Sequence, residues 1–245
     1  MQDGREQGPV QRAWQSDTGS VGKTALVSSR VFLVLFVFVL LLSALAAGQA
    51  EAPNLDDQLF DAVQKGDAAA AGQLLDRGAN ANAQGSTGET PLIMATAMGY
   101  VDVVKLLLDK GAKIDTRDNR GETALHYAAM TASIEAAKLL LDKGANIDVK
   151  DGDGFTPLMR SIVSGSLELV KLLLDRGANV EAKDSNGFTS LMAAAGGGQL
   201  EMAKALLDHG ANVNDKSNDG TTALSLAISQ KHPEIEALLR AKGAQ

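Results

Sequence analysis

The chain has 245 residues, a formal net charge of −7 and no cysteine. The missing cysteines exclude disulfide cross-links, a cysteine nucleophile and cysteine-ligated metal sites. Residues 1–50 hold four basic and three acidic residues, so the rest of the chain holds 19 basic and 27 acidic ones and a charge of −8. A region this acidic is poorly suited to neutralising phosphates, and we expect no nucleic acid among its partners.

The first fifty residues differ from the rest in composition. An apolar run covers residues 31–47, follows Arg30 directly and gives way to small residues such as Ala44 and Gly48. A basic flank, an apolar core and a small-residue exit are typical of a secretory signal. The run is shorter than the roughly 20 residues of a membrane span. The 30 residues before it are many for a signal sequence, however, so an uncleaved anchor is the alternative.

Under both interpretations the rest of the chain is exported from the cytoplasm. Basic residues precede the run and acidic ones such as Glu51 follow it, which keeps the N-terminus in the cytoplasm. We therefore predict an export signal or signal anchor in residues 1–50 and a separate region in residues 51–245. The expected location is the bacterial periplasm, or the inner membrane with contact only through residues 31–47 if the run is kept. A eukaryotic secretory route would fit the same signal.

A short motif recurs at a fixed interval in the rest of the chain. Gly154-Phe155-Thr156-Pro157-Leu158 has four counterparts, and the glycines that begin them follow one another every 33 residues: Gly88, Gly121, Gly187 and Gly220. A Gly-Ala pair keeps the same spacing from Gly78 to Gly243. A strict period of this length predicts a stack of short units rather than one globular core.

Each unit has the pattern of two helices and a loop. A threonine such as Thr156 precedes a short apolar segment and is expected to cap a first helix, with Pro157 at the position where a missing N–H costs nothing. A second helix follows, such as Val101 to Lys110. Its apolar residues are three or four positions apart and predict one buried stripe: Val101, Val104, Leu107 and Leu108. A cation and then a glycine end this helix, as the helix dipole and a left-handed C′ position favour.

The region resembles the ankyrin repeat family over about residues 55–245. The likeness rests on the Gly-x-Thr-Pro-Leu motif, on Leu125-His126-Tyr127-Ala128-Ala129 and on the Leu-Leu-Leu-Asp-x-Gly-Ala endings. It implies an all-α fold, a solenoid of helix-turn-helix units with projecting β-hairpin loops. We expect about six units, the first and last acting as caps, with the bounds 55–84, 85–117, 118–150, 151–183, 184–216 and 217–245. Arrays of this family generally bind other proteins through loop tips and first helices, and we expect this one to be monomeric.

Two departures from the repeated pattern are expected to have consequences. Arg160 replaces an apolar residue, and a buried arginine needs a carboxylate partner unless it turns to solvent. Gly196, Gly197 and Gly198 end the first helix of the fifth unit. Each glycine costs roughly 1 kcal/mol of helix propensity relative to alanine, so we predict the softest point of the array there.

The sequence contains no recognisable catalytic constellation. Its three histidines, His126, His209 and His232, do not share a metal-ligand spacing, and no nucleophile or dinucleotide motif stands outside the repeats. The aligned loop aspartates are expected to form turns rather than to bind calcium: Asp118, Asp151 and Asp184. We predict no enzymatic activity and no cofactor. The enzyme alternative would need a site that no motif reveals.

Candidate binding residues are those at loop tips and first helices that vary between units. Phe155 and Phe188 are equivalent, and we expect both to face outward as aromatic anchors. The alternative is that both fold down onto the next loop. The rest of the candidate patch is Asn119, Arg120, Met130, Asp153, Val163 and Asn186. A periodic basic row is expected in solvent: Lys150, Lys183 and Lys216.

The predicted function is that of an exported, non-catalytic module that binds a partner protein. One alternative is a scaffold anchored in the inner membrane. Another is an inhibitor of a secreted enzyme.

Overall fold

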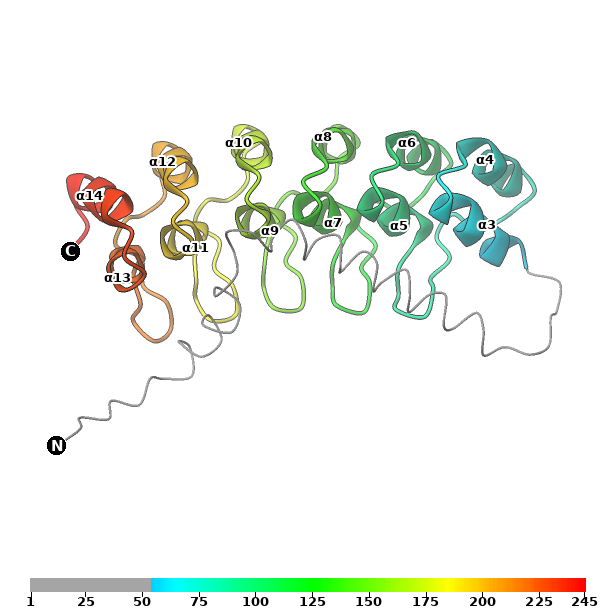
Figure 1. The fold of residues 1–245 in the computed structure, drawn as a ribbon. Coiled ribbons are helices and arrows are strands. Elements are labelled where there is room, and N and C mark those ends of the chain that lie inside the picture. Colours follow the sequence, from blue (N-terminus) through cyan, green and yellow to red (C-terminus); the bar gives the residue numbers. More distant parts are fainter. Residues whose placement is uncertain (1–53) are drawn as a thin grey trace. The chain divides into compact units, whose positions relative to one another are not determined.

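A computed structural model of the chain describes residues 54–245. The predicted export signal or anchor in residues 1–50 lies outside this part. The twelve helices of residues 54–245 form six helix-turn-helix pairs stacked side by side (Figure 1). The first helices of the pairs are α3 Leu55–Gln64, α5 Pro91–Ala97, α7 Ala124–Met130, α9 Pro157–Ser164, α11 Ser190–Gly196 and α13 Ala223–Ser229. The second helices are α4 Ala68–Asp76, α6 Val101–Asp109, α8 Ile134–Asp142, α10 Leu167–Asp175, α12 Leu200–Asp208 and α14 Pro233–Ala241.

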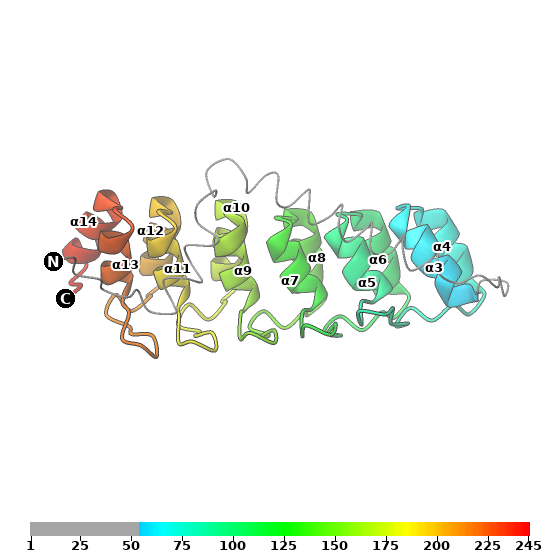
Figure 2. The same cartoon turned by 60° about the horizontal axis from the view of Figure 1, so that its bottom comes forward.

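The first helices form one row and the second helices the other, and the loops project on the side of the first helices (Figure 1). The view in Figure 2 brings these loops forward and shows them following one another along the row. This arrangement confirms the predicted all-α solenoid. None of the described helices is both long and apolar enough to span a bilayer.

The first helices of the second to sixth units begin after threonines, as predicted. The hydroxyl groups of Thr90, Thr156, Thr189 and Thr222 each accept a hydrogen bond from the backbone N–H three residues later, at 3.1 to 3.3 Å. This bond satisfies one of the N–H groups that a helix start leaves without a partner. In the third unit His126 adds a second bond, because its Nδ1 accepts from the N–H of Thr123 at 3.2 Å.

The first helices are the core of the stack, and the second helices cover them. All seven residues of α5 are buried, whereas α6 buries only Val103, Val104 and Leu107. The predicted stripe is therefore partly wrong, since Val101 and Leu108 are half-buried and Val103 takes their place. The reason is that α6 contacts α5 in its own unit and also α4 and α8 on either side. These neighbouring helices together cover the adjacent residues Val103 and Val104.

A ladder of ion pairs joins successive second helices. The cation after each helix contacts the last aspartate of the preceding one, as Lys143 does with Asp109 at 2.8 Å and Arg176 with Asp142 at 2.8 Å. The fourth contact of this ladder pairs His209 with Asp175 at 3.4 Å. All of these side chains are more than a third exposed. Exposed pairs of this kind contribute little, about 0–1 kcal/mol each.

The two ends of the stack carry polar side chains, as capping units require. In α3, Leu59, Ala62 and Val63 are buried while Asp56 and Asp57 stand in the first turn. In α14 the side chains of Glu236 and Arg240 pair at 2.9 Å on the outer surface.

The three consecutive glycines lie at the junction between the fifth and sixth units. The carbonyl oxygen of Gly196 is 3.2 Å from Nε2 of His232. A Cβ atom at Gly198 would lie 2.7 Å from the same ring, so only glycine lets the imidazole come this close. His232 therefore bridges the junction. The predicted softness of this junction stays a prediction.

Candidate functional site

The projecting loops are hairpin-shaped turns closed by aspartates. Asp118 Oδ1 accepts hydrogen bonds from the N–H groups of Arg120 and Glu122, both at 2.9 Å. Asp151 and Asp184 close their turns in the same way. The predicted turn-forming role of these aspartates is confirmed. Regular strands are absent from residues 54–245, where the only β-bridge joins Lys183 and Thr189.

Neighbouring hairpins bind one another through their backbones. The tip of each donates an N–H to a carbonyl oxygen of the preceding tip, at 2.8 to 3.0 Å, from Asn119 to Thr87, Gly152 to Arg120, Ser185 to Asp153 and Asn218 to Asn186. Gly121 lies within this contact. A Cβ atom there would be 2.9 Å from the nitrogen of Gly152, and the φ of Gly121 is +77°. The hairpins therefore form one continuous row.

The predicted basic row adds a second set of contacts between hairpins. Lys150 Nζ donates to the carbonyl oxygen of Lys183 at 2.7 Å, and Lys183 Nζ donates to that of Lys216 at 3.3 Å. Arg117 reaches the carbonyl of Lys150 in the same way. Lys150 is exposed, as expected, and Lys183 is half-buried. Both also bind the next hairpin, because each stem is long enough to reach one unit further.

A cluster of charged side chains distinguishes the third and fourth units from the others. At its centre the Glu122 side chain is only 1% exposed. Arg120 Nη2 lies 2.7 Å from Oε2 of Glu122, and Arg160 Nη2 lies 3.1 Å from Oε1. Two guanidinium groups, one from each unit, thus share one buried carboxylate. We call these residues with Asp118, Tyr127 and Asp151 the charged cluster.

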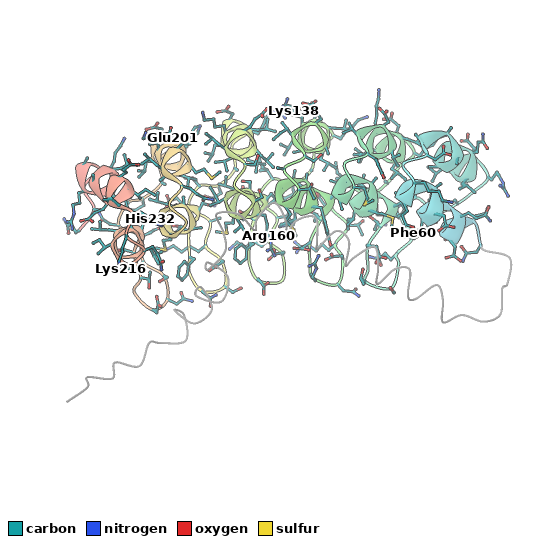
Figure 3. The ribbon with its side chains drawn as sticks, in the orientation of Figure 1. Phe60, Lys138, Arg160, Glu201, Lys216 and His232 are labelled. Carbon is teal, nitrogen blue, oxygen red and sulfur yellow. The ribbon has the colours of Figure 1, made fainter. Side chains whose placement is uncertain are left out.

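Arg160 is fixed on three sides. Its Nε donates to Asp151 Oδ2 at 2.9 Å, and its Nη2 donates to the same oxygen. Its guanidinium carbon lies 4.7 Å from the centre of the Phe155 ring, within the range of a cation–π contact. The side chain is 21% exposed and lies on the hairpin side of α9 (Figure 3). This partly buried arginine therefore has two carboxylate partners, Asp151 and Glu122.

Arg120 is held from the other side of Glu122. Its Nη2 donates to the hydroxyl oxygen of Tyr127 at 2.6 Å, and that hydroxyl donates to Asp118 Oδ2 at 2.8 Å. The guanidinium also lies over the Tyr127 ring at 5.8 Å. Unlike Arg160, the Arg120 side chain is 53% exposed, so the cluster opens to solvent at this residue.

Burial sets the protonation behaviour of the cluster. Loss of water raises the pKa of Glu122, and the nearby guanidinium groups of Arg120 and Arg160 offset part of that rise. Burial, followed by the hydrogen bond to Asp118, raises the pKa of Tyr127. The tyrosine therefore stays a neutral donor at physiological pH.

His126 joins the third unit to the fourth beneath the cluster. Its Nδ1 faces the N–H of Thr123, and its Nε2 lies 3.0 Å from the carbonyl oxygen of Phe155. Burial lowers the pKa of His126, which the bond to Phe155 partly offsets. The ring is thus a neutral cross-link between the two units.

The remaining candidate residues lie on hairpin tips or near the ends of first helices. Asn119, Asp153 and Asn186 are exposed on hairpin tips, and Met130 is half-buried at the end of α7. Val163 is 61% exposed near the end of α9. The next residue, Ser164, donates to the carbonyl oxygen of Ala129 at 2.8 Å, so the ends of α7 and α9 are in contact. Met130 and Val163 occupy equivalent positions at these two helix ends.

The expectation that both phenylalanines face outward is wrong for Phe188, which is only 8% exposed. Phe155 is half-buried and stacks on Arg160, but the position equivalent to Arg160 in the next unit is Ala193. We infer that the short alanine side chain leaves room for the ring of Phe188 to lie against its own unit. Phe188 is not an available anchor.

Sequence reasoning missed Glu122 and Tyr127 as partners of the two arginines. A signal was present, because Tyr127 and Arg160 occupy one equivalent position, where other units have Met94, Ala193 and Leu226. Two consecutive units therefore replace a small or apolar residue with one that forms hydrogen bonds.

A family model described as ankyrin repeats in three copies matches the chain at residues 59–151, 121–184 and 158–245. No curated protein matches the sequence.

Proposed function

Because this chain belongs to the ankyrin repeat family, whose arrays are generic protein–protein interaction modules, we propose that it binds a partner protein through its hairpin tips and first helices. The proposal includes export of the array, in which residues 1–50 act as a signal or an anchor, and no catalysis by the array itself. The partner carries out the chemistry or process that the array serves.

The observation that carries the proposal is the exposure of Val163. A large apolar side chain that is 61% exposed in the middle of the array loses contact with water when a partner covers it, which favours association. Met130 occupies the equivalent position of the preceding unit, and Arg120 and Asn119 are exposed on the hairpin tip of that unit. Apolar centres surrounded by polar side chains are typical of protein interfaces.

Site-specific photocross-linking in the producing cell tests this surface. A photoreactive phenylalanine analogue would replace Val163 in one variant of the full chain and Lys171, exposed on α10 of the same unit, in a matched control. We expect a defined protein adduct from position 163 and none from position 171. Equal labelling from both positions would mean that the hairpin side is not the binding surface.

Export is tested separately by cell fractionation and by mass spectrometry of the mature N-terminus. A product that begins near residues 47–51 in the periplasmic fraction is expected for a cleaved signal. An intact N-terminus in the membrane fraction would favour the anchored scaffold, and a cytoplasmic product would contradict export. A secreted enzyme as the cross-linked partner would favour the inhibitor.

A further inference from the structure

The charged cluster is more elaborate than the stability of the stack requires. Another hairpin closes through its backbone, since Asp184 of the fifth unit accepts hydrogen bonds from the N–H groups of Asn186 and Phe188. Burying a carboxylate with two guanidinium groups seldom adds net stability over apolar packing. The arrangement does hold Arg120 and Arg160 in fixed positions, one on each side of Glu122.

Both arginines have an N–H donor group that the charged cluster does not use. Among contacts within residues 54–245, Arg120 uses Nε and Nη2, and Arg160 likewise uses Nε and Nη2. The Nη1 group of each has no partner there. A guanidinium group whose plane is fixed by aromatic stacking and buried carboxylates loses little entropy when it binds a further anion.

We infer that Arg120 and Arg160 form an anchor for a carboxylate side chain of the partner protein, with an apolar side chain of the same segment resting on Met130 and Val163. Arginine and carboxylate match in geometry and form strong charge-assisted hydrogen bonds. This inference rests on the proposed function and specifies the partner as a segment with Asp or Glu next to an apolar residue.

The carboxylates around Arg120 limit where this segment can bind. Asp153 occupies the position equivalent to Arg120 one unit later and is exposed. A bound carboxylate is attracted by Arg120 and repelled by Asp153, and also by Asp118 and Glu122 beside Arg120. It therefore lies on the exposed side of the guanidinium group, away from these carboxylates. The apolar side chain lies toward the C-terminal ends of α7 and α9, where Met130 and Val163 are found.

Selection from a random peptide library displayed on phage tests the inference with the full-length chain as bait. We expect enriched peptides to carry Asp or Glu beside Leu, Ile, Val or an aromatic residue. In a synthetic copy of one such peptide, exchange of the acid for its amide should weaken binding at least about tenfold. Arg120→Gln should cause a similar loss, and the two changes together should cost little more than either alone.

Three variants serve as controls. Arg176→Gln removes an exposed arginine from the second-helix face and should leave the affinity unchanged. Arg120→Lys keeps the charge but loses the planar fork, and should bind with an intermediate affinity. Asp153→Asn should strengthen binding, because it removes the opposing charge. Each variant is checked for an unchanged unfolding midpoint. Where the midpoint is lowered, binding is compared under conditions in which the variant is still folded.

The outcomes separate this inference from the proposed function. Peptides that lose affinity in a Val163→Asp variant but lack acidic residues would overturn the carboxylate anchor and leave the binding surface intact. Failure to enrich any peptide, or binding insensitive to Val163→Asp, would count against both. Arg120-dependent binding to phosphatidylglycerol vesicles without any acidic peptide would overturn the inference in favour of a lipid.

Discussion

The second-helix face and the hairpin face use charge in different ways. On the second-helix face one exposed ion pair is repeated from unit to unit, as in Lys143 with Asp109 and Arg176 with Asp142. On the hairpin face the third and fourth units share a buried cluster around Glu122 that the other units lack. Figure 3 shows Arg160 on the hairpin side and Lys138 and Glu201 on the other. The repeated ion pairs recur from unit to unit along the stack. The unrepeated cluster is what distinguishes this array from one built of identical units.

The largest expected difference between the faces is in stability. Arg160→Ala removes a partner from two nearly buried carboxylates, Glu122 and Asp151, and should cost about 3 kcal/mol, as the breaking of a buried ion pair does. Arg176→Ala on the outer ladder should cost less than about 1 kcal/mol. Urea unfolding followed by circular dichroism measures both. Equal losses would mean that the cluster is no more important than an exposed pair.

The hairpin row offers a second comparison, between an internal unit and the last one. Alanine at Gly121 meets the backbone of Gly152 and a positive φ, whereas alanine at Gly220 meets only a φ of +84° with nothing within 4 Å. Gly220→Ala should therefore cost about 1 kcal/mol through backbone strain alone. Gly121→Ala should cost about 1–2 kcal/mol more, since the two backbones must separate. If the two variants unfold at the same urea concentration, contact between the hairpins is not a source of stability.

The smallest expected effect is the pH dependence that His126 gives to the hairpin face. Its pKa in the folded array is lowered by burial, so its contribution to stability is complete above its unfolded pKa of about 6.5. As the pH falls from there toward the lowered folded pKa, the unfolded chain binds the proton first and stability falls. The loss is limited to about 1.4 kcal/mol per pH unit for one proton.

Unfolding of the wild type and of His126→Gln between pH 7.5 and 5.5 tests this expectation. The variant should be less stable at pH 7.5, because it lacks the bond to Phe155, but its stability should fall less on acidification. His209 and His232 are present in both proteins and cancel in the comparison. Parallel curves would show that His126 does not resist protonation.

The periodic features of the fold were predictable because they depend on local chemistry. A threonine such as Thr156 caps its helix through a residue three positions away, and Asp151 closes its turn through residues two and four positions away. The location of most candidate residues on the hairpin side followed from the same spacing. Their binding role stays a prediction.

The charged cluster was not predictable in the same way. Glu122 and Arg160 are 38 positions apart, which does not match the 33-residue period, so aligning the units does not bring them together. Phe188 was misplaced for a related reason. Alignment gives equivalent positions equivalent surroundings, but Arg160 lies against Phe155, whereas the position equivalent to Arg160 in the unit of Phe188 is Ala193. What a repeat alignment omits is the contact between unlike positions of neighbouring units.

The hairpin row also has a consequence for how such an array changes length. Because each tip uses the same N–H and carbonyl groups toward its two neighbours, a duplicated or deleted block of 33 residues re-forms the same bonds at its new boundary. Gene duplication can therefore lengthen the array without new interface chemistry. The boundary between the third and fourth units is the exception, since a block inserted there would separate Glu122 from Arg160. Growth on either side of that boundary would extend the surface around an unchanged centre.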